Sequence, residues 1–193
     1  MRRTSILAVL LLPVLGLGFP PDDSKVSGFT ADFLIQLDGV QKQILDLEGA
    51  VPQEKFSWRP AEGVRSVGEV YLHIAFGNYF LLKLAGYEPP TDAGFTMDGK
   101  KWESSTTDRA KTAEVLKHSF EHVRGVVTKV TPADLEKKVK MFGNEVTVRN
   151  AMMTVLSHLH EHLGQSIAYA RMNGVVPPWT AAEQAAQAKK DAK

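Results

Sequence analysis

The stretch TVRNAMMTVLSHLHEHLGQSIAYARMNG, residues 147–174, is a long amphipathic segment that favours a helical fold. Its apolar side chains recur every three or four residues and predict one helix with a single buried face: Met152, Val155, Leu159, Leu163 and Ala170. Thr147 is a typical N-cap, and Asn173-Gly174 is a typical C-terminal stop. The segment therefore predicts one complete helix that packs against other helices.

Three further segments show the same helical pattern. They cover about Thr30–Leu47, the residues from Ser66 to about Leu84, and about Asp108–Val130. Ser66-Val67-Gly68-Glu69 is a capping-box pattern that marks the start of the second segment. Four long amphipathic helices without a strong strand signal predict an all-α fold, a four-helix bundle.

The connections carry turn signals. Pro89 to Lys101 is predicted as a long loop, and Thr131-Pro132 is predicted to open a short helix, because proline is favoured in the first helical turn. Gly143-Asn144 indicates a tight turn or a small hairpin. The polar segment after Trp179 is predicted to be a frayed helix or disordered.

The first residues resemble an export signal. Arg2 and Arg3 precede an apolar run over residues 6–17. At its end, Gly16 and Gly18 supply small residues at a plausible cleavage point. This run is too short to span a bilayer comfortably, so the pattern predicts a cleaved signal peptide. A twin-arginine route and a retained N-terminal anchor stay open as alternatives. The chain has no cysteine, which excludes disulfides and a lipoprotein anchor.

The predicted domain organisation has four parts: a signal peptide at 1–18, a linker at 19–29, the bundle at 30–179 and a polar, disordered tail at 180–193. The expected location is periplasmic or secreted, with no stable membrane insertion after cleavage. The 193 residues are 44% hydrophobic and 23% charged, as in soluble globular proteins, and the net charge of +1 gives no reason to expect nucleic acid as a partner. A homodimer is left open.

His158 and His162 lie four residues apart on the last predicted helix, so their side chains share one face. Two imidazoles at this spacing can converge on one metal ion at about 2.0–2.1 Å. The pair lies at the margin of the apolar stripe, where Gln165 and Tyr169 continue a polar row. Such a row is expected to line a cleft between helices.

His73 is predicted to point inward on the second helix, with apolar neighbours at helical spacing. A buried neutral histidine needs a hydrogen-bond partner or a metal ion. Gly77, one turn further on, would leave space close to the helix. We therefore predict a metal site at His73, His158 and His162.

Two other histidine patterns are weaker. His118 and His122 have the same spacing, but they are predicted to lie on a solvated face of the third helix. The sequence around His158 contains the letters of a zinc-protease motif in the wrong order, because Glu161 precedes the second histidine instead of following the first. Metalloprotease chemistry is therefore not expected.

These residues together resemble the DinB/YfiT-like superfamily. The resemblance rests on three stretches and covers about Thr30 to Trp179: Trp58-Arg59-Pro60; Ser66 to Val70 with His73; and His158 to Gln165, continuing to Pro177-Pro178. It implies a four-helix bundle with a divalent metal ion, zinc or nickel, held by His73, His158 and His162. Several family members resemble thiol-dependent S-transferases or isomerases. The export signal is a departure, since most such proteins look cytoplasmic.

The sequence thus leaves two functional readings. The first is an exported, metal-dependent hydrolase or thiol S-transferase that acts on a small molecule of unknown identity. The alternative is a non-catalytic metal-binding or interaction bundle of the same fold. No residue is a convincing general base, so the catalytic residues stay unknown. Glu69 is a candidate to orient His73, although the capping box already explains it, and Gln165 is a candidate to face the ion's remaining ligands or to cap the bundle end.

Overall fold

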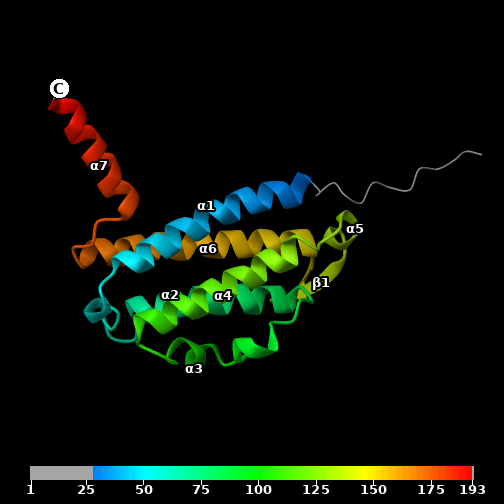
Figure 1. Cartoon of the computed structure of the whole chain (residues 1–193). Helices are drawn as coiled ribbons and strands as arrows, with labels where there is room; N and C mark the ends of the chain where they lie inside the picture. Colours follow the sequence, from blue (N-terminus) through cyan, green and yellow to red (C-terminus); the bar gives the residue numbers. More distant parts are fainter. Residues whose placement is uncertain (1–27, 193) are drawn as a thin grey trace, which may run out of the picture.

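The computed structural model describes residues 28–192, and its centre is a bundle of four long helices (Figure 1). They are α1 (Gly28–Ala50), α2 (Val67–Leu84), α4 (Arg109–Val127) and α6 (Val148–Met172). The predicted all-α bundle is confirmed. Each helix is longer or shorter than predicted by only a few residues at its ends, where helix boundaries are least defined.

The four helices are not arranged in simple sequence order. Both α1 and α2 pack against α4 and α6, so α1 and α2 occupy opposite corners of the bundle although they follow each other in the chain. The guanidinium of Arg149 lies 5.1 Å from the centre of the Phe29 ring, so α1 and α6 start at the same end of the bundle. This topology places α2 beside α6, and the candidate site lies between these two helices.

Local capping fixes where the helices start. Ser66 and Glu69 form both hydrogen bonds of the predicted capping box on α2, and the Thr147 side chain caps α6 as predicted. Asp108 caps α4, and Thr131 caps the predicted short helix α5 (Pro132–Leu135). These caps satisfy backbone N–H groups that have no partner inside the helix.

The region predicted as a small hairpin forms one. Strands β1 (Lys138–Met141) and β2 (Asn144–Thr147) pair antiparallel, with Met141 opposite Asn144. The turn uses Phe142 at φ 50° and Gly143 at φ 83°. Positive φ is uncommon at a bulky residue such as Phe142. The Phe142 side chain points away from the hairpin core and is 65% exposed.

The long connection between α2 and α4 is more ordered than predicted. It contains the 3-10 turn η2 (Thr91–Ala93) and a short helix, α3 (Gly99–Glu103), which packs against α2; another 3-10 turn, η1 (Gln53–Lys55), follows α1. Trp102 is buried, and its Nε1 donates a hydrogen bond to the carbonyl oxygen of Leu72 at 3.0 Å. A five-residue helix has no periodicity to detect, and this tertiary contact stabilises it.

The C-terminal residues form the helix α7 (Pro178–Asp191), which projects from the end of the bundle in Figure 1. The predicted disorder over 180–193 is therefore corrected to an exposed helix for the residues described. None of the α7 residues is buried, so its alanine, glutamine, glutamate and lysine residues support the helix through their high intrinsic propensity.

The predicted signal peptide at 1–18 lies outside the described residues, as does most of the predicted linker at 19–29. The last two linker residues, Gly28 and Phe29, belong to α1 instead. Within residues 28–192, no helix is both long enough and apolar enough to cross a membrane.

Candidate metal centre

His73 of α2 meets His158 and His162 of α6 in one cluster. The potential ligand nitrogen atoms of the three imidazoles all lie within 4.8 Å of one another. The ring centres are 4.4 Å apart for His158 and His162, 4.5 Å for His73 and His162, and 5.0 Å for His73 and His158. The structure thus brings the three predicted histidines together, and metal binding itself stays a prediction.

Gly77 makes room for His158. A Cβ atom on Gly77 would lie 2.1 Å from Cε1 of the His158 ring, which is far inside van der Waals contact. The space predicted beside Gly77 is therefore filled by one of the histidines. Glycine lets the imidazole lie directly on the α2 backbone, and any larger residue would push His158 out of the cluster.

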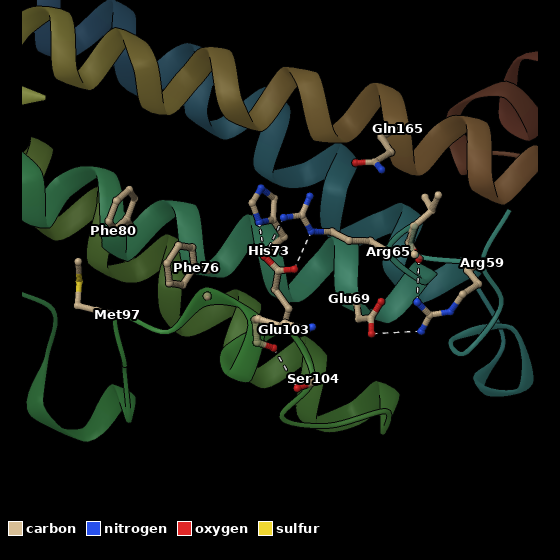
Figure 2. A pocket seen from close by; sticks show the side chains of 14 residues that line it. Arg59, Arg65, Glu69, His73, Phe76, Phe80, Met97, Glu103, Ser104 and Gln165 are labelled. Atoms are coloured by element: carbon tan, nitrogen blue, oxygen red, sulfur yellow. Dashed lines mark hydrogen bonds and ion pairs between the residues drawn. The ribbon is translucent and has the colours of Figure 1, made fainter. Parts of the chain in front are cut away.

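His73 is oriented by Glu103 of α3 (Figure 2). The distance from His73 Nδ1 to Glu103 Oε1 is 2.6 Å, and Arg65 donates to the same carboxylate from Nε at 2.7 Å and from Nη2 at 3.0 Å. Burial alone would raise the pKa of Glu103, but the hydrogen bonds and charges of His73 and Arg65 outweigh it and lower this pKa to about 2. The ionised carboxylate can only accept, so Nδ1–H of His73 donates to it, and the other ring nitrogen, Nε2, faces His158.

His162 has a corresponding partner on its own helix. Its Nδ1 lies 2.8 Å from Oε1 of Gln165, and Gln165 Nε2 donates to the Tyr169 hydroxyl at 3.2 Å. Because the amide oxygen faces Nδ1, it accepts from Nδ1–H of His162. In the neutral ring, Nε2 of His162 therefore keeps its lone pair. Burial lowers the pKa of His162, which favours the neutral ring that metal binding requires.

His158 is half-buried beside the other two rings. Burial, reinforced by the neighbouring charges of His162, His73 and Arg65, lowers its pKa to about 3, so the ring is neutral at physiological pH. Its Nε2 lies 3.2 Å from Nε2 of His73, and its Nδ1 is buried without a hydrogen-bond partner. Two unprotonated ring nitrogens repel each other, so the short contact requires a proton on one of the two Nε2 atoms or a cation between the rings.

This arrangement fits a divalent ion with three nitrogen ligands. Two ligands of a tetrahedral zinc ion at about 2.0–2.1 Å are roughly 3.3 Å from each other. The His73–His158 nitrogen distance of 3.2 Å meets this value, and the other nitrogen atoms lie within 4.8 Å. Small side-chain rotations would therefore complete the coordination geometry. The outer partners of His73 and His162 are of the kind that orient metal ligands in known sites.

The cluster borders an open cleft of about 940 Å³ between α2, α3 and the end of α6. His73 and Gln165 line this cleft, while His158 and His162 lie behind them. In Figure 2, Phe76, Phe80 and Met97 lie on one side of His73, and Arg65, Glu69 and Arg59 lie on the other. A small molecule in the cleft can therefore contact His73.

Other residues singled out from the sequence have structural roles. Glu69 completes the capping box and pairs with Arg59 at 3.2 Å, and it makes no hydrogen bond to His73, so the proposed orienting role belongs to Glu103. Glu103 was missed because it lies in the segment predicted as a loop, 30 residues from its partner. Gln165 contacts His162 and does not cap the bundle end.

The second histidine pair is less exposed than predicted. His118 and His122 are half-buried against Tyr79, whose hydroxyl lies 3.2 Å from His118 Nδ1. The interpretation as a fully solvated face is therefore wrong in detail. His118 Nε2 lies 3.9 Å from Asp92 Oδ1, but within residues 28–192 this pair forms no group of three mutually close potential ligands. Glu161 is exposed, in keeping with the absence of a zinc-protease arrangement.

The fold and the site define a class of protein: a four-helix bundle in which histidines from two adjacent helices meet beside a cleft. The profile of the DinB superfamily matches residues 36–166, so the chain belongs to the DinB superfamily. No curated protein was found to match the chain.

Solved structures share the fold at low sequence identity. YfiT from Bacillus subtilis, described as a probable metal-dependent hydrolase with an unusual four-helix bundle topology, aligns with a TM-score of 0.61 and 17% identity, covering 82% of this chain and 95% of YfiT. A DinB-like protein from Bacillus cereus ATCC 10987 aligns with a TM-score of 0.55 and 20% identity over 79% of this chain and 95% of its own. The DinB-like protein YjoA from Bacillus subtilis aligns with a TM-score of 0.56 and 19% identity, covering 77% of this chain and 93% of YjoA.

Proposed function

We propose that this protein binds a divalent metal ion through His73, His158 and His162 and acts on a small molecule as a metal-dependent hydrolase or transferase. The observation that carries the proposal is the convergence of three imidazoles within 4.8 Å beside an open cleft. Zinc and nickel are among the metal ions that imidazole ligands suit. The description of YfiT as a probable metal-dependent hydrolase supports the same assignment.

The residues of the chain have distinct roles in this proposal. Glu103 and Gln165 hold the rings of His73 and His162 so that their Nε2 lone pairs face the same point. Gly77 and the surrounding core keep His158 in place. Three protein ligands leave at least one coordination position, and a bound ion would supply Lewis-acid chemistry there.

A non-catalytic metal-binding bundle is the second candidate, and one observation favours it. Both carboxylates that line the cleft are held in ion pairs, Glu69 by Arg59 and Glu103 by Arg65 and His73. A pKa of about 2 leaves Glu103 a weak general base at neutral pH. A transferase whose substrate supplies its own nucleophile, such as a thiolate, does not need such a base.

Metal analysis of the untagged protein tests the proposal. After expression with zinc and nickel supplied, the wild type should contain close to one divalent ion per chain, and His158→Ala should contain almost none. His122→Ala is the matched control, since it removes one histidine from the other i, i+4 pair and should retain the metal. A metal-free wild type under repletion, or equal loss in both variants, would contradict the proposal.

Export is proposed from the sequence alone, since residues 1–27 lie outside the described part of the chain. N-terminal sequencing of protein from the periplasm or medium of an expressing bacterium should find a mature chain that starts near residue 19. An intact Met1 in protein recovered only from the cytoplasm would contradict export.

A further inference from the structure

The cleft beside the histidines has two chemically different ends (Figure 2). On one side of His73, the rings of Phe76 and Phe80 are stacked, with centres 5.2 Å apart and an interplanar angle of 16°. Met97 lies opposite them and is 54% exposed. We call Phe76, Phe80 and Met97 the aromatic shelf. Half-exposed aromatic rings in a cleft provide apolar surface for a ligand.

The shelf is continuous with the metal centre. The His73 and Phe76 rings are stacked at 6.5 Å and 18°, so the metal ligand and the shelf follow each other along one face of α2. From His73 to Phe80 the helix rises about 10 Å. Phe142 at the hairpin tip extends the row, with its ring centre 6.2 Å from that of Phe80. The apolar surface is therefore long enough for an aryl group or a short alkyl chain.

The other end of the cleft is basic. Arg59 and Arg65 are each balanced by a carboxylate, Glu69 and Glu103 respectively. Lys100 is the exception, because it lines the cleft but has no ion-pair partner among residues 28–192. The cleft lining therefore has one uncompensated positive charge.

Lys100 and His73 line the same cleft. Lys100 precedes Glu103 by three residues on α3, so the two side chains share one face of that short helix. Arg65 also leaves its Nη1 without a hydrogen bond in the described structure, since Nε and Nη2 bind Glu103. An anionic group in the cleft would therefore find two cationic donors in its lining, Lys100 and Arg65.

We infer that the cleft binds small organic anions that carry an aryl arm. The anionic group binds at Lys100 and Arg65, the arm lies on the aromatic shelf, and the part of the ligand between them faces His73. The inference deepens the proposed function by naming its substrate class, and it depends on that function only for the reaction that follows binding.

Calorimetric titration with a matched set of probes tests this inference on both metal-free and zinc-loaded protein. The set consists of 4-phenylbutyrate, 4-phenylbutylamine with the opposite charge, and butyrate without the ring. We expect 4-phenylbutyrate to bind metal-free protein about tenfold more tightly than either of the other two probes. This ratio corresponds to a difference of roughly 1.4 kcal/mol in binding free energy. Its advantage over the amine should shrink with added salt, which screens exposed charges.

Variants separate the two ends of the cleft. Phe80→Ala and Met97→Ala should each weaken 4-phenylbutyrate by about three- to tenfold and leave butyrate unaffected. Lys100→Met keeps the aliphatic stem and should remove most of the preference for the anion. Ile35→Ala and Lys111→Met change an exposed apolar residue and an exposed lysine away from the cleft, and they should have no effect.

The outcomes distinguish this inference from the metal proposal. Equal binding of the amine and the acid, or wild-type affinity in both shelf variants, would overturn the inference even if zinc binds normally. Selective binding of 4-phenylbutyrate to metal-free protein supports it even if the protein takes up no zinc. Binding that emerges only when the protein is diluted would assign the cleft to a second copy of the chain and overturn the inference.

Discussion

Each imidazole of the candidate centre is oriented by a different neighbour. A carboxylate from another element holds His73, an amide on the same helix holds His162, and the bare backbone at Gly77 accommodates His158. The first two contacts fix which ring nitrogen keeps its lone pair, and the third fixes position without a hydrogen bond. Metal affinity should therefore depend on residues that never touch the ion.

Replacing Glu103 tests the orientation of His73. We expect Glu103→Ala to weaken zinc binding by about 10- to 100-fold, and Glu103→Gln by less, because the amide oxygen can still accept from Nδ1. Competition with a chelator measures the Kd. Glu69→Gln is the control, since Glu69 lines the same cleft without a hydrogen bond to a histidine. An unchanged zinc affinity in Glu103→Ala would show that Glu103 does not contribute to metal binding.

Gly77→Ala should displace His158, because the added Cβ would lie 2.1 Å from the ring. We expect a loss of about 1–3 kcal/mol in the free energy of unfolding and a marked loss of zinc affinity. Gly125→Ala on α4 is the matched change, since its Cβ would meet nothing within 4 Å, and it should gain up to about 1 kcal/mol. Urea denaturation of both variants measures these changes in the free energy of unfolding. An unchanged free energy of unfolding in Gly77→Ala would contradict the packing of His158 on Gly77.

The neutral state of buried His158 predicts a pH dependence for the metal-free protein. An unfolded histidine gains a proton near pH 6.5, whereas His158 in the folded protein does so only at about 3. Stability is therefore highest above the unfolded pKa and falls with decreasing pH, by about 1.4 kcal/mol per pH unit for this group. Urea titrations at pH 7 and pH 5 with chelator should show a loss of about 2 kcal/mol. The loss should shrink in His158→Gln and persist in His160→Gln.

At the scale of elements, short segments between the long helices complete the site. The helix α3 contributes Glu103 and Lys100 to the cleft, and its buried Trp102 attaches it to α2 through a hydrogen bond. The hairpin β1–β2 presents Phe142 at the apolar end. The long helices therefore supply the histidines, and the connections supply the surroundings.

The helix α7 should contribute little to the stability of the bundle beyond its first turn. Trp179 packs against the core, but none of the α7 residues is buried. Deleting residues 182–193 should therefore leave the Tm within about 2 °C of the wild type. Trp179→Ala should lower the free energy of unfolding by about 1–2 kcal/mol. A large loss on deletion would show that α7 has a partner in solution.

At the scale of the whole molecule, the order of the helices around the bundle creates the site. Because α1 and α2 occupy opposite corners, α2 lies beside α6, and His73 meets His158 across 85 residues of sequence. In a bundle whose consecutive helices are neighbours throughout, α2 would lie between α1 and α4. The histidines of α2 and α6 would then be separated by the core.

Metal binding should stabilise the folded protein as a whole, because the site does not exist in the unfolded chain. At zinc concentrations about 100 times the Kd, the gain is about 2.7 kcal/mol, which corresponds to a rise of about 5–10 °C in Tm. Differential scanning calorimetry should show this rise for the wild type and for His122→Ala, and its absence for His158→Ala. An equal rise in all three proteins would point to binding outside the cluster.

The helical class, the starts of α2, α5 and α6, and the hairpin could be predicted from the sequence, because these depend on local periodicity, caps and turn residues. The sequence also identified the three histidines, two from i, i+4 spacing and His73 from its inward position. Spacing alone could not distinguish the pair His158 and His162 from the pair on the third long helix, since both pairs have the same local geometry.

Only the tertiary structure decided what surrounds the histidines. Glu103 contacts His73 from a segment with no periodic pattern. The His158 ring lies against Gly77 only because α2 and α6 pack closely there. The same holds for the two-ended cleft, whose aromatic shelf and unpaired Lys100 come from α2, α3 and the loop before α3. These features depend on contacts between residues far apart in the chain, for which local physical preferences carry no signal.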